Sequence, residues 1–240
     1  MSELVNASLP TLTEAFDQLE RAFGRFRVGN DNSPLVVSAP PTFAARWLIG
    51  RLDDFQTRYP EIELRLLATR RLVDFNVEDV DVAVRFVSGP FTGLHAERLM
   101  PESIIPVAAP KLVESIKSAS DLLNRTLLHD DIFKRDPAFP DWDTWLTSFG
   151  VTVASSLRIR RFGNTNLVIQ AVTAGLGVAL AWYSLVADDL HTGKLVRLFS
   201  SMLPTSHGYH LVAPTNHLSR PKVAAFREWL LDQGMRQQVS

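Results

Sequence analysis

The sequence contains no cysteine. A chain without cysteine forms neither disulfide bonds nor thiolate metal sites, which argues against a small secreted domain and fits a reducing compartment. Long apolar runs are also missing, because the longest, residues 175–186, falls well short of the ~20 residues that span a bilayer. The first residues, 1–6, lack the basic stretch and apolar run of a secretory signal. We therefore expect a soluble cytoplasmic protein without a membrane segment.

An excess of one charge sign is absent as well, since 25 basic residues face 26 acidic ones. A protein that binds nucleic acid through its phosphates needs a basic surplus, so we do not expect this chain itself to bind DNA. The sequence is 46% apolar and 21% charged, which is typical of a globular protein with a buried core. Its 240 residues suffice for one large domain or two small ones.

Strong enzyme motifs are not present. The sequence has no G-x-S-x-G elbow, no G-x-x-x-x-G-K-[ST] loop and no H-E-x-x-H motif, so we do not expect an enzyme. His207 and His210 would point to opposite faces of a strand, which favours edge residues over a metal site. Gly175 and Gly177 follow a predicted helix and precede a strand, which favours a helix C-cap over a phosphate-binding turn. No cofactor is indicated.

Two charged clusters have alternative interpretations. Five aspartates lie close together in the second half of the chain: Asp130, Asp131, Asp136, Asp141 and Asp143. Paired acids for hydrolysis are one interpretation, but the prolines among them favour a solvated loop in which Asp141 caps the next helix. Arg158, Arg160 and Arg161 have no interleaved aromatic residues to stack on bases, which favours a solvated face or a dimer contact over a nucleic-acid site.

The amino-terminal residues predict a helix that is separate from the rest of the fold. Apolar residues alternate at spacings of four and three, as in a coiled-coil seam: Val5, Leu9, Leu12, Phe16, Leu19, Phe23 and Phe26. Thr11 and Glu14 form a capping box, so the helix begins near Thr11, after Pro10. The stripe packs either on its own domain or on a second copy. We expect a linker and dimerisation helix within residues 1–30, followed by a flexible hinge.

Strands and helices then alternate twice. The first set consists of strands 35–39, 62–67 and 81–86 with helices 42–59 and 72–77. Predicted strands 94–100 and 104–108 and short helices from Pro110 and near 120–123 follow, and then strands 127–129, 157–160 and 177–180 with helices 142–149 and 164–174. A last strand, 209–213, and a helix, 220–233, could return to the first set. The pattern predicts an α/β fold of two Rossmann-like subdomains with a central cleft, residues 34–108 plus 205–240 and residues 109–204.

Two predicted helix starts lie at carboxyl ends of strands. Thr42 follows the first strand, and Asn164 and Thr165 follow a strand of the second subdomain. Free backbone N–H groups at helix starts favour an anionic group, and ligands of open α/β sheets bind at this edge. The alternative is that Thr42 and Asn164 only cap their helices. The sequence therefore predicts an anionic ligand between the subdomains.

Ordered sequence blocks resemble a known family. They are residues 51–64, 81–85, 106–110, 170–180, 193–196 and 225–230. Together they resemble the effector-binding domain of LysR-type transcription regulators over about residues 34–233. Residues 141–146 and Arg85-Phe86 are similar to the branch that contains the glycine-cleavage regulator and the β-lactamase-inducing regulator.

The resemblance implies a ligand-sensing regulatory domain. It implies a small-molecule effector, self-association as a dimer or tetramer, and DNA contact only through a winged helix-turn-helix that this chain lacks. Residues 9–26 are similar to the helix that links the two domains in that family. The alternative is a solute-binding protein of the same two-lobed architecture, which needs an export signal or membrane anchor, and neither is visible.

The family's effector-contacting positions can be transferred one by one. They correspond to Thr42, Thr69, Arg85, Phe86, His129, Asn164, Thr165 and Tyr209. Where many relatives have Ser, Thr or Gly after the first strand, this chain has Pro40 and Pro41, and a proline removes one N–H donor from the site.

Overall fold

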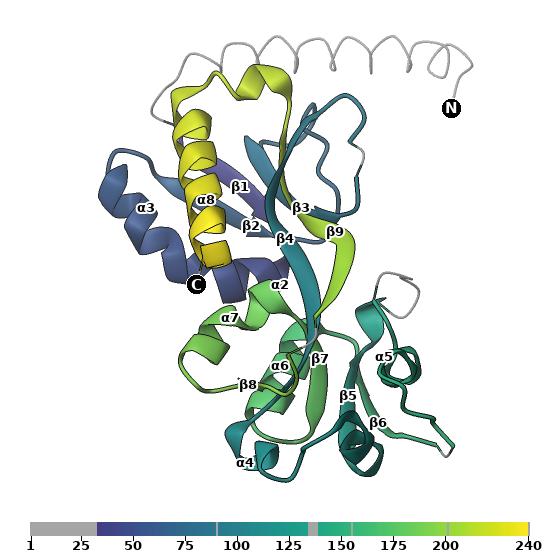
Figure 1. The fold of residues 1–240 in the computed structure, drawn as a ribbon. Coiled ribbons are helices and arrows are strands. Elements are labelled where there is room, and N and C mark those ends of the chain that lie inside the picture. The colour runs from purple at the N-terminus through teal and green to yellow at the C-terminus, as the bar shows by residue number, and fades with distance from the viewer. Residues whose placement is uncertain (1–32, 90, 134–138, 155, 201, 240) are drawn as a thin grey trace, which may run out of the picture.

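The structure is a computed structural model that describes residues 33–89, 91–133, 139–154, 156–200 and 202–239. The predicted helix within residues 1–30 lies outside the described residues. The described strands form one mixed, nine-stranded sheet in the order β2-β1-β3-β9-β4-β7-β5-β6, with β8 beside β4. Figure 1 shows two bodies joined by the long strands β4 and β9. We call the part built on β1–β3 the upper lobe and the part built on β5–β7 the lower lobe.

The upper lobe has a small parallel sheet. Its elements before the crossing strands are β1 Leu35–Ala39, α2 Pro41–Phe43, α3 Leu52–Arg58, β2 Leu64–Ala68 and β3 Val82–Val87. A π-helical turn, Ala44–Leu48, and a 3₁₀ turn, Ile49–Arg51, join α2 to α3, so that helical segment 41–58 is continuous. Strand β1 lies between β2 and β3, pairs with both in parallel, and is buried along its whole length. This agrees with the Val-rich pattern of a central strand.

The lower lobe repeats this arrangement. Its elements are α4 Pro110–Val113, a 3₁₀ helix Ala119–Asn124, β5 Thr126–Asp130, a 3₁₀ turn Asp131–Phe133, α5 Trp142–Ser148, β6 Arg158–Phe162, α6 Thr165–Thr173, β7 Val178–Trp182, α7 Tyr183–His191 and β8 Val196–Arg197. Strand β5 pairs in parallel with β6 and β7. The carboxyl end of β5 therefore lies beside the start of the connection from β6 to α6.

Two long antiparallel strands connect the lobes. Strand β4, His95–Ala108, pairs with β7 of the lower lobe and with β9, Leu203–Ala213, which in turn pairs with β3 of the upper lobe. The register between β4 and β9 shifts between Arg98 and Met100 and again between Pro101 and Ser103. Such irregularities bend a strand pair. The shifts lie in the middle of β4, which runs between the lobes in Figure 1.

The chain returns to the upper lobe at its end. After a 3₁₀ turn, Thr215–His217, helix α8, Pro221–Val239, lies beside α3. The Trp229 indole N–H donates to Asp54 at 2.8 Å, and Arg58 pairs with Asp232 at 3.1 Å. The predicted return to the first subdomain is confirmed, whereas the residue limits of the two subdomains stay a prediction.

Most predicted elements are confirmed, and three predictions are wrong. The predicted helix 72–77 is a series of turns, in which Leu72 and Val77 are 70% and 74% exposed. The Asp74 carboxylate accepts from the Asn76 N–H at 2.9 Å, and such a local bond competes with helix formation. The two strands predicted within 94–108 are one strand, and β9 begins six residues earlier than residue 209. Helix α7 was not predicted.

Two local predictions about helix ends are confirmed. The Asp141 carboxylate accepts from the Thr144 N–H at 2.8 Å and so caps α5. Gly175 has φ 72° and follows α6, with its N–H bonded to the Val172 carbonyl and the next N–H bonded to the Ala171 carbonyl. This is the Schellman pattern, which requires a left-handed residue.

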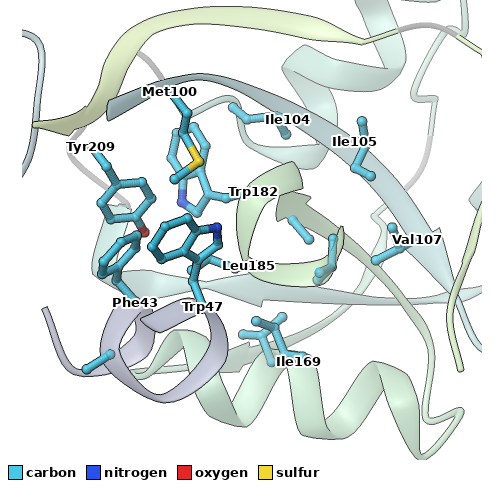
Figure 2. Packing of buried hydrophobic residues seen from close by; sticks show 14 of the residues in the cluster. Phe43, Trp47, Met100, Ile104, Ile105, Val107, Ile169, Trp182, Leu185 and Tyr209 are labelled. Atoms are coloured by element: carbon cyan, nitrogen blue, oxygen red, sulfur yellow. The ribbon is translucent and has the colours of Figure 1, made fainter. Parts of the chain in front are cut away.

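The core continues across both lobes as one buried cluster. Its largest fully buried side chains are aromatic: Trp47, Trp142, Trp145, Trp182, Trp229, Phe43, Phe55 and Phe226. Figure 2 shows Phe43 and Trp47 of the upper lobe close to Trp182 and Leu185 of the lower lobe. Among the described helices, none is long and apolar enough to cross a membrane.

Candidate functional site

Arg85 is buried in the upper lobe, and its guanidinium is occupied by protein oxygens. Nη1 donates to the Ser38 carbonyl at 3.2 Å and to the Val84 carbonyl at 2.6 Å. Nη2 donates to the Ser38 hydroxyl at 2.7 Å and to the Arg71 carbonyl at 3.1 Å. Burial lowers the pKa of Arg85, and the charge of Arg71 adds to this while Glu78 opposes it. Arg85 thus fastens the end of β1 to the segment after β2, and its predicted contact with a ligand stays a prediction.

Thr42 and Thr69 follow β1 and β2, as predicted. Thr42 is partly buried, and its hydroxyl has no hydrogen-bond partner among the described residues. The Thr69 N–H donates to the Ala39 carbonyl at 2.9 Å, which holds Thr69 at the carboxyl end of β1. The Thr69 hydroxyl accepts from the Arg71 N–H at 3.2 Å. Both threonines therefore lie at the edge of the sheet where an α/β fold binds its ligands.

An aromatic cluster lies where the lobes meet. Phe86 at the end of β3 contacts Tyr209 of β9 and Trp182 of β7, with ring centroids 4.8 and 4.7 Å apart. Tyr209 also contacts Phe43, at 4.3 Å, and is only 3% exposed. Figure 2 shows Tyr209, Phe43, Trp47, Met100 and Trp182 gathered in one place. The structure thus brings together two predicted residues, Phe86 and Tyr209, and joins them to the lower lobe through Trp182.

A buried glutamate lies at the crossing of the lobes. Glu102, in the middle of β4, accepts from the N–H groups of Ser103 and Ser184 at 2.9 and 3.2 Å and from the Ser184 hydroxyl. Burial raises its pKa to about 7, although these hydrogen bonds oppose the shift. Burial also raises the pKa of Tyr209 well above its usual value, with a further contribution from the charge of Glu102. Glu102 therefore holds the first turn of α7 against the crossing strand.

The lower lobe contributes polar groups at the ends of β5 and the start of α6. The Thr165 hydroxyl donates to the Asp130 carboxylate at 2.5 Å, and both residues are buried. Asn164 is exposed, and its side-chain oxygen caps α6 by accepting from the Asn166 N–H at 2.8 Å. The Asn164 amide nitrogen has no partner in the described part of the chain. The interpretation of Asp130 as part of a solvated loop is wrong, because this carboxylate is 3% exposed.

His129 lies beside these groups but is buried. Its Nε2 is 3.8 Å from Asp131, and Asp131 also pairs with Arg161 at 3.1 Å. Burial lowers the pKa of His129, and the positive charge of Arg161 adds to this effect. His129 is therefore mainly neutral at pH 7. Within the described residues, no group of three or more His, Asp or Glu side chains is arranged to hold a metal ion.

Ion pairs join helical segment 41–58 to helix α7. Arg46 pairs with Asp189, and its Nε donates to the Leu185 carbonyl at 3.3 Å. Arg51 pairs with Asp188 at 2.9 Å. The two lobes are thus connected by polar contacts beside the aromatic cluster. These contacts could not be predicted from the sequence, because α7 itself was not predicted.

The fold defines the class of domain to which the chain belongs. Two α/β lobes joined by two crossing strands, with polar groups at the carboxyl ends of parallel strands in both lobes, form a two-lobed domain of the periplasmic-binding-protein type. The chain belongs to the LysR family, because residues 29–235 match the model of the LysR substrate binding domain.

Known proteins support this membership. The chain is 33% identical to the glycine cleavage system transcriptional activator of Escherichia coli K12 over 230 residues, which is 95% of this chain and 73% of that protein. The solved effector domain of AmpR from Pseudomonas aeruginosa is 30% identical with a TM-score of 0.69, and the match covers 87% of this chain and all of that one. The AmpR effector binding domain from Citrobacter freundii has a TM-score of 0.70 at 24% identity and covers 85% of this chain and 99% of that one, so it supports the fold.

Proposed function

We propose that this chain is the sensing part of a transcription regulator and binds a small effector with an anionic group between its two lobes. The observation that carries the proposal is a set of donors without partners among the described residues, at the strand and helix ends of both lobes. They are the Thr42 hydroxyl, the Arg70 guanidinium and the Asn164 amide. Ligand sites typically combine an apolar wall with a few polar groups that fix orientation, and the aromatic cluster of Phe86 and Tyr209 supplies such a wall.

Under this proposal some of the predicted residues touch the effector, and the others hold the surrounding segments in place. Thr42, Thr69 and Asn164 contact the effector, and Phe86 and Tyr209 pack against it. Thr165 and His129 shape the lower lobe beside it. Arg85 acts through the segment after β2, because its own donors bond Ser38, Val84 and Arg71.

Binding between the lobes would change their arrangement. An effector that contacts both lobes favours the arrangement in which both contacts are made, and it shifts the population toward that state. In an oligomer of this chain, such a shift changes the presentation of attached DNA-binding domains. The regulator is favoured over the solute-binding protein because the relatives are transcriptional activators. The same relatives are not enzymes.

Calorimetry on a threonine variant tests the proposal. Native mass spectrometry of the purified chain is used to search for a co-purifying small molecule, and titration of the molecule identified gives its affinity. Thr42→Val should weaken binding by up to roughly tenfold, because it removes one neutral hydrogen bond of about 0.5–1.5 kcal/mol. Thr152→Val, at an exposed position of the lower lobe, is the matched control and should leave the affinity unchanged. Equal affinities of wild type and Thr42→Val, with normal melting temperatures, would contradict the proposed site.

A further inference from the structure

Helix α7 belongs to the lower lobe by its place in the chain, but residues of the upper lobe hold it. It directly follows β7, and two arginines of helical segment 41–58 reach its second half. Arg46 forms an ion pair with Asp189. Arg51 donates to both carboxylate oxygens of Asp188, at 3.1 and 2.9 Å. The second half of α7 is therefore attached to the upper lobe by charged contacts.

Both arginines lie on an irregular stretch of helix. Arg46 lies in the π-helical turn, and Arg51 ends the 3₁₀ turn that follows it. Arg51 also donates to the Trp47 carbonyl at 2.8 Å, and its guanidinium carbon lies 4.7 Å from the centroid of the Trp47 ring. Turns of the π-helical kind are frequent at functional sites. The same segment begins at Pro41, next to Thr42, so the two arginines and the proposed effector contact share one helical segment.

The first turn of α7 is attached to a crossing strand instead. Glu102 of β4 accepts from the Ser184 N–H at 3.2 Å and from the Ser184 hydroxyl. One of the two register irregularities between β4 and β9 lies between Pro101 and Ser103, at Glu102 itself. Irregularities of this kind interrupt the ladder and bend the strands. The first turn of α7 is therefore attached where the strands between the lobes bend, and Asp188 lies about 6 Å further along the helix.

We propose that the pairs Arg46–Asp189 and Arg51–Asp188 form a latch that holds the lobes in the described arrangement, and that without it the lobes turn about the crossing strands near Glu102. The latch is a property of the free chain and does not depend on the function proposed above. Partly exposed ion pairs favour one conformation by a modest factor each, so loss of both should raise the population of other lobe arrangements by on the order of tenfold. Since a ligand shifts the lobes from the populations that already exist, the latch sets the state from which binding starts.

The first test measures how often the lobe junction opens. The chain has no cysteine, so one introduced thiol reports on one place. Leu185→Cys puts a thiol at a buried position of α7 close to Trp47 (Figure 2), where iodoacetamide reacts only after opening. Arg46→Ala together with Arg51→Ala should speed this labelling by on the order of tenfold. Leu146→Cys, buried in α5 within the lower lobe, is the matched thiol, and its labelling should change by less than about twofold.

Further variants separate the ion pairs from other effects of the arginines. Arg58→Ala removes ion pairs of the same kind within the upper lobe, to Asp54 and Asp232, and should leave the labelling at the junction within about twofold of wild type. Asp188→Asn together with Asp189→Asn removes the acceptors of the latch and should speed the labelling by a factor similar to that of the arginine double variant. Combining the two sets should add little, because both remove the same pairs.

A distance between the lobes distinguishes movement of the lobes from local fraying of α7. Gln56→Cys in α3 and Thr147→Cys in α5 are exposed positions outside α7, and spin labels on both report this distance. The latch predicts that the arginine double variant broadens the distance distribution or adds a second peak, whereas Arg58→Ala keeps that of wild type. An unchanged distribution in the folded double variant, or equal acceleration of both thiols, overturns the latch. Neither measurement uses an effector, so this failure leaves the proposed effector site standing.

Discussion

Replacing Glu102 by glutamine should remove one component of the pH dependence of stability. The carboxyl is buried in the native state and its pKa is about 7, against an ordinary value of 4.5. The native state therefore holds a proton at pH values where the unfolded chain has lost it. Since the native state then binds more protons, the contribution of Glu102 to the free energy of unfolding falls as pH rises from about 4.5 to about 7 and is constant outside this window.

The size of the effect follows from the shift. Each pKa unit corresponds to about 1.4 kcal/mol, so the buried carboxyl of Glu102 costs up to about 3 kcal/mol above pH 7. In Glu102→Gln the amide nitrogen can donate to the Ser184 hydroxyl, and its oxygen can still accept from the Ser103 N–H. The free energy of unfolding of the variant, relative to that of wild type, should therefore increase by up to about 3 kcal/mol as the pH is raised from 4.5 to 8.

Urea unfolding at several pH values measures this difference. Other buried groups, such as His129 and His217 with their lowered pKa values, titrate alike in both proteins. Their contributions therefore cancel in the difference between the two free energies of unfolding. Glu114→Gln, at an exposed position, is the control and should follow wild type to within about 0.5 kcal/mol at every pH. A difference between Glu102→Gln and wild type that is constant over the whole pH range would refute the reasoning.

Three further predictions concern packing, lobe contacts and assembly. Trp145→Ala should lower the free energy of unfolding by about 3–5 kcal/mol, because the side chain is fully buried, and a loss below about 1 kcal/mol in urea unfolding would contradict the described packing. Arg46→Ala should destabilise more than Arg51→Ala, because Asp189 is largely buried and Asp188 is mostly exposed, and thermal melts of both variants check the order. Leu19→Glu should weaken self-association in sedimentation experiments, since it places a charge in the predicted apolar stripe, and unchanged assembly would exclude that stripe as the contact.

Local patterns predicted the parts of the fold that local interactions specify. The apolar run 35–39 became a buried central strand, and Asp141 and Gly175 mark helix ends that the chain forms with its own neighbours. Residues 72–77 form turns instead of the helix that the apolar spacing predicts. The side chains of Asp74 and Glu78 accept hydrogen bonds from nearby backbone N–H groups, and these local bonds compete with helix formation.

Helix α7 shows what a single sequence does not reveal. Trp182 precedes it and provides no side-chain cap, so the usual start signal is missing. The Ser184 N–H is bonded instead by Glu102, 82 residues earlier in the chain. Asp130 is a similar case, because its burial depends on α6, whose Thr165 hydroxyl donates to it. The resemblance to the family identified the positions around it, but its burial is visible only in the fold.

The contact of one effector with both lobes is tested most directly by hydrogen–deuterium exchange, with and without the effector identified by mass spectrometry. The account predicts slower exchange in three short segments, around Thr42, at residues 69–71 and at residues 164–165, together with α7. Protection should appear in both lobes at the same ligand concentration. Protection confined to one lobe, or to segments away from these strand and helix ends, would contradict the account.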